Sequence, residues 1–390
     1  MVAGAPRAIL EQPIFAWFLL MYVLKRLVAA VLFALPLLLP ATGFGLAAEP
    51  AGPWQAGFKL ERFAYSAPKR LVLIDWWYPT LEVNAVPFDY GLGQGRVVEQ
   101  GAVAPGPHPL IVLSHGAFGA ARNYSWIAEA LARAGYLVAG ISHYGESYVY
   151  GASTIDPAAV LELRARPRDI SATLDFVEKN SWVIGLVDWQ RVGFLGHSSG
   201  GATGLLLAGA RFDEQQMGRY CATQAAAQDR GCDYAKQRLS PVSDLPVSRR
   251  STEAALSHTD QRISAVALLD PALGPGFYDY SNMHPDIAGL LVGSAHNDFL
   301  PAESHAGLIG SRWPGAETHW LSSGEGHFVY LNECARDLFA NGVALCSDRP
   351  HVSRRAVHRE LEGYILSFFA REILGKLRDA KWDIGNRNNE

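Results

Sequence analysis

Short apolar segments alternate with segments of helical spacing through most of this 390-residue sequence. Apolar runs of this kind are typical of strands that are buried on both faces, and the helices between them allow parallel connections. The alternation therefore predicts an α/β fold with a mostly parallel central sheet and helices on both faces. The predicted strands are 70–78, 110–113, 136–141, 192–195, 263–269, 287–292 and 318–321, and the predicted helices are 126–134, 169–180, 201–210 and 357–374.

Two regions interrupt the alternation. Residues 84–109 are rich in Gly and Pro, which predicts a loop. Residues 211–261 are polar, contain two cysteines and separate a predicted helix from a predicted strand. This second region is predicted to be an inserted, lid-like segment over the edge of the sheet. We therefore expect a single domain, residues 49–390, with one insertion.

The N-terminal segment has the layout of a secretory signal peptide. Lys25 and Arg26 precede an apolar run at 27–39, and small residues follow through Ala48. We expect residues 1–48 to be removed, and Met21 is a possible true start because a complete signal begins there. The alternative is a retained membrane anchor, since a second apolar stretch lies just upstream. Neither run reaches about 18 uninterrupted apolar residues, so no stable membrane span is expected after cleavage.

Cysteine usage agrees with export to the periplasm or the outside of the cell. The sequence has four cysteines, an even number that fits an oxidising compartment. The two short-loop pairs, Cys221 with Cys232 and Cys334 with Cys346, are the expected disulfides. The four cysteines lack C-x-x-C spacing, so we expect no zinc site.

Composition excludes other classes of protein. Hydrophobic residues make up 49% of the chain and charged residues 18%, which supplies a large core and argues against disorder. The formal net charge of −4 gives no electrostatic signature of nucleic-acid binding. We therefore expect no nucleic-acid partner.

Ser198 is the candidate nucleophile. It lies in a G-x-S-x-G pattern formed with Gly196 and Gly200. The pattern is short enough to arise by chance, but here it follows a predicted strand and precedes a predicted helix of small residues. A nucleophile elbow requires that context, because its sharp turn lifts the serine Oγ to the edge of the sheet. The alternative interpretation is an ordinary Gly-rich turn.

An earlier segment, Ser114-His115-Gly116, also follows a predicted strand. Enzymes with a nucleophile elbow have their oxyanion loop at this place in the chain. A tetrahedral intermediate needs two N–H groups aimed at its oxygen. The backbone N–H groups of Ala117 and Ser199 are the predicted donors. His115 is expected to hold the loop and not to act as a base.

His327 is the candidate general base. It lies in a Gly-rich loop late in the chain, and such a loop can bring it within about 3 Å of the serine Oγ. Two carboxylates are candidates for the acid that orients it. Asp298, which follows the predicted strand 287–292, is favoured, and Asp270, at the end of the preceding predicted strand, is the alternative. His296 and His305 lie near Asp298 in sequence, but nothing else indicates a metal, so we expect no metal or cofactor.

Several motifs together resemble one family. The chain is similar to the bacterial dienelactone-hydrolase-like proteins related to platelet-activating-factor acetylhydrolase, from about Arg70 to the last predicted helix. The matching segments are Trp77-Tyr78-Pro79, Ser114-His115-Gly116, Trp126-Ile127-Ala128-Glu129, Arg166-Pro167-Arg168-Asp169, Gly196 to Gly200, and Gly326-His327-Phe328.

The resemblance implies an α/β-hydrolase fold and a Ser–His–Asp triad with backbone donors near Ala117 and at Ser199. It leaves the acid open, because acetylhydrolases of this type place it where Asp270 stands and many other hydrolases place it where Asp298 stands. True dienelactone hydrolases have cysteine where this chain has Ser198, so their substrate is not expected here. The implied activity is cleavage of a small-molecule or lipid ester through an acyl-enzyme. An exported peptidase or amidase of the same fold, or a non-catalytic binding protein, are the alternatives.

Overall fold

The computed structural model describes residues 54–66, 70–156, 159–160, 163, 165–233, 258–334, 337–340 and 343–375. All of them belong to one compact unit, Pro50–Glu390. The expected signal peptide, residues 1–48, lies outside the described residues, as does the part of the expected insertion at 234–257.

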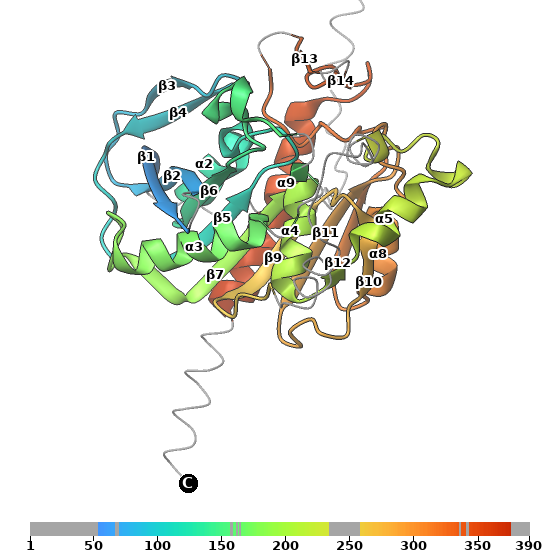
Figure 1. Cartoon of the computed structure of the whole chain (residues 1–390). Helices are drawn as coiled ribbons and strands as arrows, with labels where there is room; N and C mark the ends of the chain where they lie inside the picture. The colour runs from blue at the N-terminus through green and yellow to red at the C-terminus, as the bar shows by residue number, and fades with distance from the viewer. Residues whose placement is uncertain are drawn as a thin grey trace, which may run out of the picture. The chain divides into compact units, whose positions relative to one another are not determined.

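Within the described residues, ten strands form one sheet in the order β12-β11-β9-β7-β5-β6-β2-β1-β4-β3 (Figure 1). The six strands from β12 to β6 run parallel, and β2 and β1 extend the sheet with antiparallel pairings. The predicted mostly parallel sheet is thus confirmed. The strands are β1 Gln55–Tyr65, β2 Arg70–Thr80, β3 Val86–Asp89, β4 Gln94–Glu99, β5 His108–Ser114, β6 Leu137–His143, β7 Val187–His197, β9 Ile263–Leu269, β11 Ala288–Ser294 and β12 Glu317–Leu321.

The prediction of a loop at 84–109 is wrong. This segment contains β3 and β4, which pair with each other antiparallel, and β4 also pairs with β1. Val97 and Val98 of β4 are buried and anchor the pair on the domain. Gly and Pro disfavour central strands, but a strand at the edge of a sheet tolerates them, as Pro87 in β3 illustrates.

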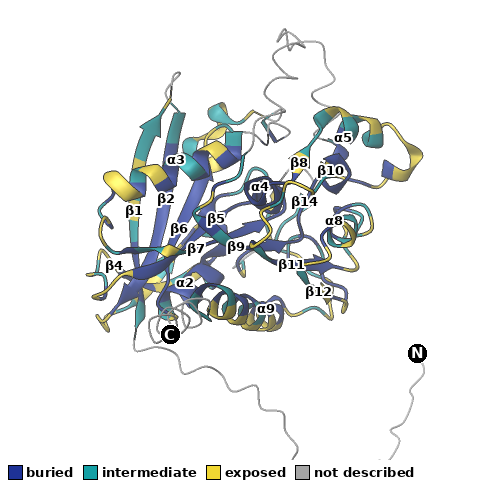
Figure 2. Cartoon of the chain, turned by 90° about the horizontal axis from the view of Figure 1, so that it is seen from below, coloured by how far each residue is buried: buried dark blue, intermediate teal, exposed yellow. Residues whose placement is uncertain are grey.

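Helices cover both faces of the sheet (Figure 2). Successive residues of β5 point to opposite faces: Leu110 and Val112 pack in the core with α3 and α4, whereas Ile111 and Leu113 pack with α2 and α9. Two hydrophobic cores therefore enclose the sheet, and every residue of β5 and β6 is buried. The helices are α2 Ser125–Arg133, α3 Ala165–Lys179, α4 Ser199–Ala208, α5 Glu214–Cys221, α8 Ala306–Arg312 and α9 Arg354–Phe369.

The described part of the expected insertion is joined to the domain by pairing of backbone strands. The strand β8 (Arg211–Phe212) pairs antiparallel with β10 (Phe277–Asp279), and α5 follows it. A second two-stranded sheet, β13 (Phe339–Ala340) with β14 (Val343–Ala344), precedes α9. Short 3-10 helices also occur in the connections, at η1 Ala121–Tyr124, η2 Tyr148–Tyr150, η3 Ala152–Thr154, η5 Gln224–Ala226 and η6 Gly274–Gly276, and a π-helical turn, η7 Ala370–Gly375, follows α9.

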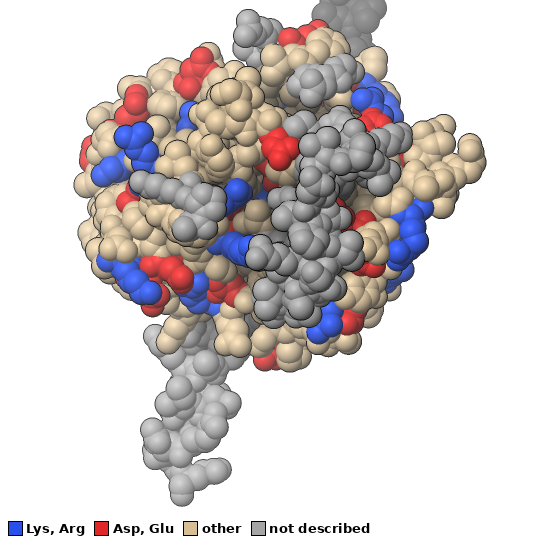
Figure 3. All heavy atoms as spheres, viewed as in Figure 1, with Lys and Arg blue, Asp and Glu red and all other residues tan. Residues whose placement is uncertain are grey.

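Cys221 is bonded to Cys232, and Cys334 is bonded to Cys346. Disulfides of this kind are compatible with an oxidising, exported location. In the part of the chain that the structure describes, no helix has the length and apolarity that a membrane span requires. Figure 3 shows basic and acidic side chains interspersed on one face of the molecule.

Candidate active site

Ser198 lies on a strained turn between β7 and α4. Its backbone angles are φ 55° and ψ −117°, in a region that residues other than glycine rarely adopt. The neighbouring glycines allow the turn to form. A Cβ atom at Gly196 would overlap the backbone of Gly200, and one at Gly200 would overlap the carbonyl oxygen of Ser114. The strand, the two glycines and the helix start therefore hold the serine in one defined position.

Three side chains form a single chain of hydrogen bonds. The Nε2 atom of His327 lies 2.9 Å from the Oγ atom of Ser198. The Nδ1 atom of the same ring lies 2.6 Å from a carboxylate oxygen of Asp270. Because a carboxylate accepts hydrogen bonds, Nδ1 carries the ring proton and Nε2 is left to accept the serine proton. This arrangement can make the serine a nucleophile.

The strand order explains why these residues meet. The strands β7 and β9 are parallel neighbours, with His197 opposite Leu269, so Ser198 and Asp270 leave the sheet side by side at its carboxyl edge. His327 reaches the same edge from the loop after β12. Substrate sites in open α/β sheets form at this edge.

Of the two candidate acids, the structure brings Asp270, and not the favoured Asp298, to the imidazole of His327. Asp298 is exposed, and its Oδ1 atom accepts the backbone N–H of His327 at 3.0 Å, so it contacts the main chain and not the imidazole. Asp270 is buried and also accepts hydrogen bonds from the Asn297 side chain and from the Ser294 N–H at 3.3 Å. Asp270, directly after β9, is therefore aimed at the ring, whereas Asp298, in the loop after β11, contacts the backbone of the loop that carries His327.

The two expected oxyanion donors, Ala117 and Ser199, both line the cavity beside Ser198. Ser199 is the first residue of α4, and the first N–H groups of a helix have no acceptor within it. Gly116, which precedes Ala117, lies close to Ser198: a Cβ atom added at Gly116 would be 3.2 Å from the Ser198 Cβ. Both residues therefore lie at the cavity, and the loop before Ala117 passes close to Ser198.

A hydrogen-bond relay that sequence reasoning missed joins these two loops. The N–H of Gly116 donates to the Tyr124 hydroxyl at 3.0 Å, which donates to His197 Nδ1 at 2.8 Å. His197 Nε2–H then donates to the carbonyl oxygen of His327 at 3.0 Å. Burial and the neighbouring His327 hold the pKa of His197 well below its usual value, so its ring is neutral and these directions are fixed. In the sequence, the one indication of this role was that His197 lies directly before Ser198, inside the G-x-S-x-G pattern.

A second Ser–His–Asp chain lies inside the protein. Ser114 Oγ is 2.9 Å from His143 Nε2, and His143 Nδ1 is 2.8 Å from Asp169. All three residues are at most 1% exposed, and the cavity is lined by others. Burial alone would raise the pKa of Asp169, but hydrogen bonds from His143 and Arg70 lower it, so the carboxylate stays charged. Without access for a substrate, this set is a structural network.

The loop before Ala117 is tied to that network. Arg166 donates to the carbonyl oxygen of His115 at 2.6 Å and forms a buried ion pair with Glu146 at 2.6 Å. His115 Nδ1–H donates to the carbonyl oxygen of Gly116 at 2.6 Å, and its Nε2 accepts the N–H of His143 at 3.0 Å. Burial, and then the charge of Arg166, hold the pKa of His115 well below its usual value. His115 therefore holds the loop as a neutral ring, in the way the sequence predicts.

A cavity of about 840 Å³ opens at Ser198. Binding pockets for organic molecules are commonly about 300–1,000 Å³, mostly apolar with a few polar groups. The two lining residues with formal charges, Arg230 and Asp233, pair with each other at 3.1 Å. The apolar lining includes Leu92, Phe118, Ile155, Val160, Leu273, Phe299, Leu300, Phe328, Leu331, Leu338, Val343 and Leu345.

No group of three or more His, Cys, Asp or Glu side chains is placed to hold a metal ion, as far as the described residues extend. His305, which lies near Asp298 in sequence, instead contacts the buried Asp229 at 2.7 Å.

No protein-family model matches this sequence, and no curated protein matches it either. Among solved structures, the chain is similar to a ferulic acid esterase from Streptomyces cinnamoneus, with 22% sequence identity and a TM-score of 0.52. The match covers 84% of this chain and 93% of that one. Together with the sheet order, this likeness shows that the chain has the α/β-hydrolase fold.

Proposed function

We propose that this protein is a serine hydrolase that cleaves carboxylic esters through an acyl-enzyme on Ser198. The observation that carries the proposal is the continuous hydrogen-bond chain from Ser198 through His327 to Asp270, which faces a mostly apolar cavity. Ser198 thus has both an adjacent base and space for a substrate.

The proposed reaction has two displacements. His327 Nε2 takes the proton of Ser198 as Oγ attacks the ester carbonyl carbon. The carbonyl oxygen becomes an oxyanion that accepts hydrogen bonds from the N–H groups of Ala117 and Ser199, while Asp270 stabilises the charged imidazole. The alcohol leaves with the proton from His327, and water then attacks the acyl-enzyme by the same steps. The reaction needs no metal or organic cofactor.

The esterase name of the structural neighbour and the motif resemblance to acetylhydrolase-like esterases support ester cleavage over amide cleavage, by analogy. We place the chain, within this proposal, among those dienelactone-hydrolase-like esterases. The two disulfides support export to the periplasm or beyond.

The test combines labelling with turnover. A fluorophosphonate probe should form an adduct at Ser198, and p-nitrophenyl acetate should be hydrolysed faster than aminoacyl arylamides. The Ser198→Ala variant should lose the adduct and lower kcat by about 10⁴-fold or more, because no other group supplies the nucleophile.

Ser311→Ala is the matched control, because that serine is exposed on α8 and should leave both readouts unchanged. Faster turnover of the arylamides would favour a peptidase. Absence of both an adduct and turnover would favour a non-catalytic binding protein.

A further inference from the structure

The two disulfides close loops that both contribute walls to the cavity. The loop between Cys221 and Cys232 contributes Arg230 and Gly231. The loop between Cys334 and Cys346 contributes Leu338, Val343 and Leu345, which are all apolar. The cross-links are therefore placed where the substrate space is shaped, and the second loop supplies an apolar surface.

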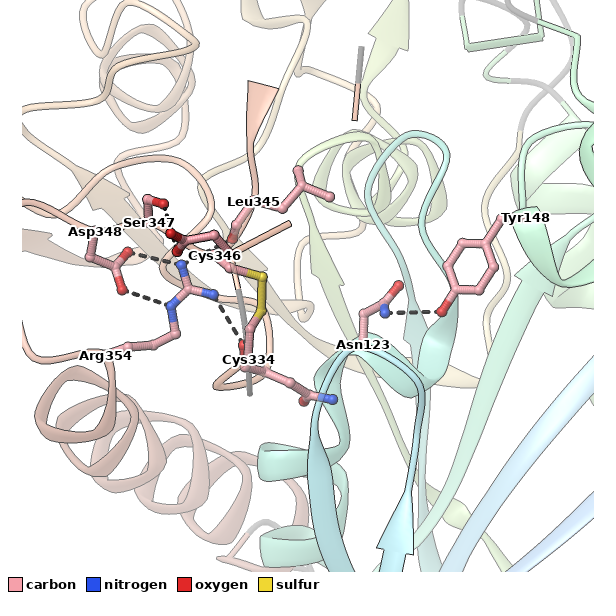
Figure 4. Close-up of a disulfide and its surroundings, with 10 residues drawn as sticks. Asn123, Tyr148, Cys334, Leu345, Cys346, Ser347, Asp348 and Arg354 are labelled. Carbon is pink, nitrogen blue, oxygen red and sulfur yellow. Dashed lines mark hydrogen bonds and ion pairs between the residues drawn. A yellow bond between two sulfur atoms is a disulfide. The ribbon is translucent and has the colours of Figure 1, made fainter. Parts of the chain in front are cut away.

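The loop between Cys334 and Cys346 is held at both ends. Leu338 and Leu345 are joined across it by a backbone hydrogen bond of 2.8 Å. Arg354 of α9 donates to the carbonyl oxygens of Asn332 and Leu345, each at 3.0 Å, and pairs with Asp348 at 2.8 Å (Figure 4). The guanidinium, which has three partners, and the disulfide therefore anchor the two ends of the loop.

Leu345 projects from the loop toward the side on which Asn123 and Tyr148 lie (Figure 4). These two residues also line the cavity, and the Asn123 side chain donates to the Tyr148 hydroxyl at 3.1 Å. Asn123 is itself fixed, since its side-chain oxygen accepts the Ala120 N–H at 2.7 Å. The cavity thus has an apolar wall on one side and a fixed polar pair on another.

We infer that the cavity takes esters that carry a large apolar group, and that the loop closed by Cys334 and Cys346 determines this specificity. The inference rests on the proposed function. A small ester such as ethyl acetate would leave most of the 840 Å³ empty, and the apolar wall would remain exposed to water. A larger apolar group would bury that wall, and the favourable free energy of binding grows with each methylene removed from water.

The experiment measures kcat/KM for two series of esters: p-nitrophenyl esters from acetate to dodecanoate, and acetates of alcohols from ethanol to decanol. In at least one series, kcat/KM should rise about threefold per methylene over the first several carbons. Leu345→Trp, whose larger ring takes up space along this wall, should abolish that rise. The double variant Cys334→Ala/Cys346→Ala should lower kcat/KM for the longest esters by about tenfold, because the wall loses its cross-link.

Fluorophosphonate labelling of Ser198 in each variant checks that the active site is folded. Ile184→Ala is the control for loss of an apolar side chain, because Ile184 is exposed and lies outside the cavity lining. The inference is overturned if short esters are hydrolysed but kcat/KM does not rise with chain length in either series. It is also overturned if the rise of kcat/KM survives Leu345→Trp. The proposed function stands in both cases. No turnover of any ester overturns both.

Discussion

At the scale of single residues, the environment of each carboxylate separates the two candidate acids. Asp270 is buried at 2% exposure, so its charge acts on the imidazole with little screening by water. Asp298 is exposed and accepts the backbone N–H of His327. In the proposed mechanism, Asp270 would stabilise the charged imidazole, whereas Asp298 would hold the loop that carries His327.

Asp270→Asn should lower kcat by about 10⁴-fold, because the amide no longer stabilises the charged imidazole and permits the wrong tautomer. Asp298→Asn should lower kcat by less than about tenfold, since the amide oxygen can still accept the His327 N–H. Steady-state kinetics with p-nitrophenyl acetate measures both effects. A larger loss at Asp298 than at Asp270 would refute the assignment of the acid.

At the scale of elements, α9 supports the loop that carries His327. His358 of α9 donates through Nε2 to the carbonyl oxygen of Val329 at 2.9 Å. Its ring also stacks on Trp126 of α2, with ring centres 4.0 Å apart. Burial lowers the pKa of His358 to about 4, because the charged ring would lose its hydration. One neutral histidine thus joins two helices and the loop that carries His327.

This contact should make stability depend on pH. An unfolded chain binds a proton at His358 below about pH 6.5, whereas the folded chain does so only near pH 4. The stability that depends on the neutral ring is therefore present above pH 6.5 and is lost as the pH falls to about 4. The difference of about 2.5 pKa units corresponds to about 3 kcal/mol. The free energy of unfolding, measured with urea, should fall from pH 7 to pH 4 by about 3 kcal/mol less in His358→Gln than in the wild type. An equal fall in both proteins would contradict the prediction.

At the scale of the whole molecule, buried charges join distant parts of the chain behind the active site. Asp169 of α3 pairs with Arg70 of β2 at 2.6 Å, and Arg166 of the same helix pairs with Glu146 in the connection after β6. The Arg166 and Glu146 side chains are at most 1% exposed. Loss of one partner from such a pair leaves an uncompensated charge in the interior.

Arg166→Met should therefore destabilise the protein by about 3–5 kcal/mol in denaturant unfolding. The double variant Arg166→Met/Glu146→Leu should recover part of that loss, because no isolated charge remains buried. Arg355→Met removes the arginine of an exposed pair with Glu333, whose side chains are 74% and 43% exposed, and should cost less than about 1 kcal/mol. Equal effects of the two single variants would show that the buried pair is not an important source of stability.

The sequence by itself determined the features that depend on local pattern. Alternating apolar strands and helices predicted the parallel sheet, and the strand 263–269 has the predicted ends. The serine turn was also readable, since its glycines, the strand before it and the helix after it are neighbours in the chain. His327 was indicated by its place after a late strand.

Only the tertiary structure decided the rest, because those features depend on which strands lie side by side. Asp270 and Asp298 both follow predicted strands, and the sequence does not show that β9 lies between β7 and β11, which brings Asp270 to the imidazole. The relay through Tyr124 and His197 joins residues 73 positions apart. The strands β3 and β4 form in a Gly- and Pro-rich segment because the edge of the sheet offers partners that no local pattern reveals.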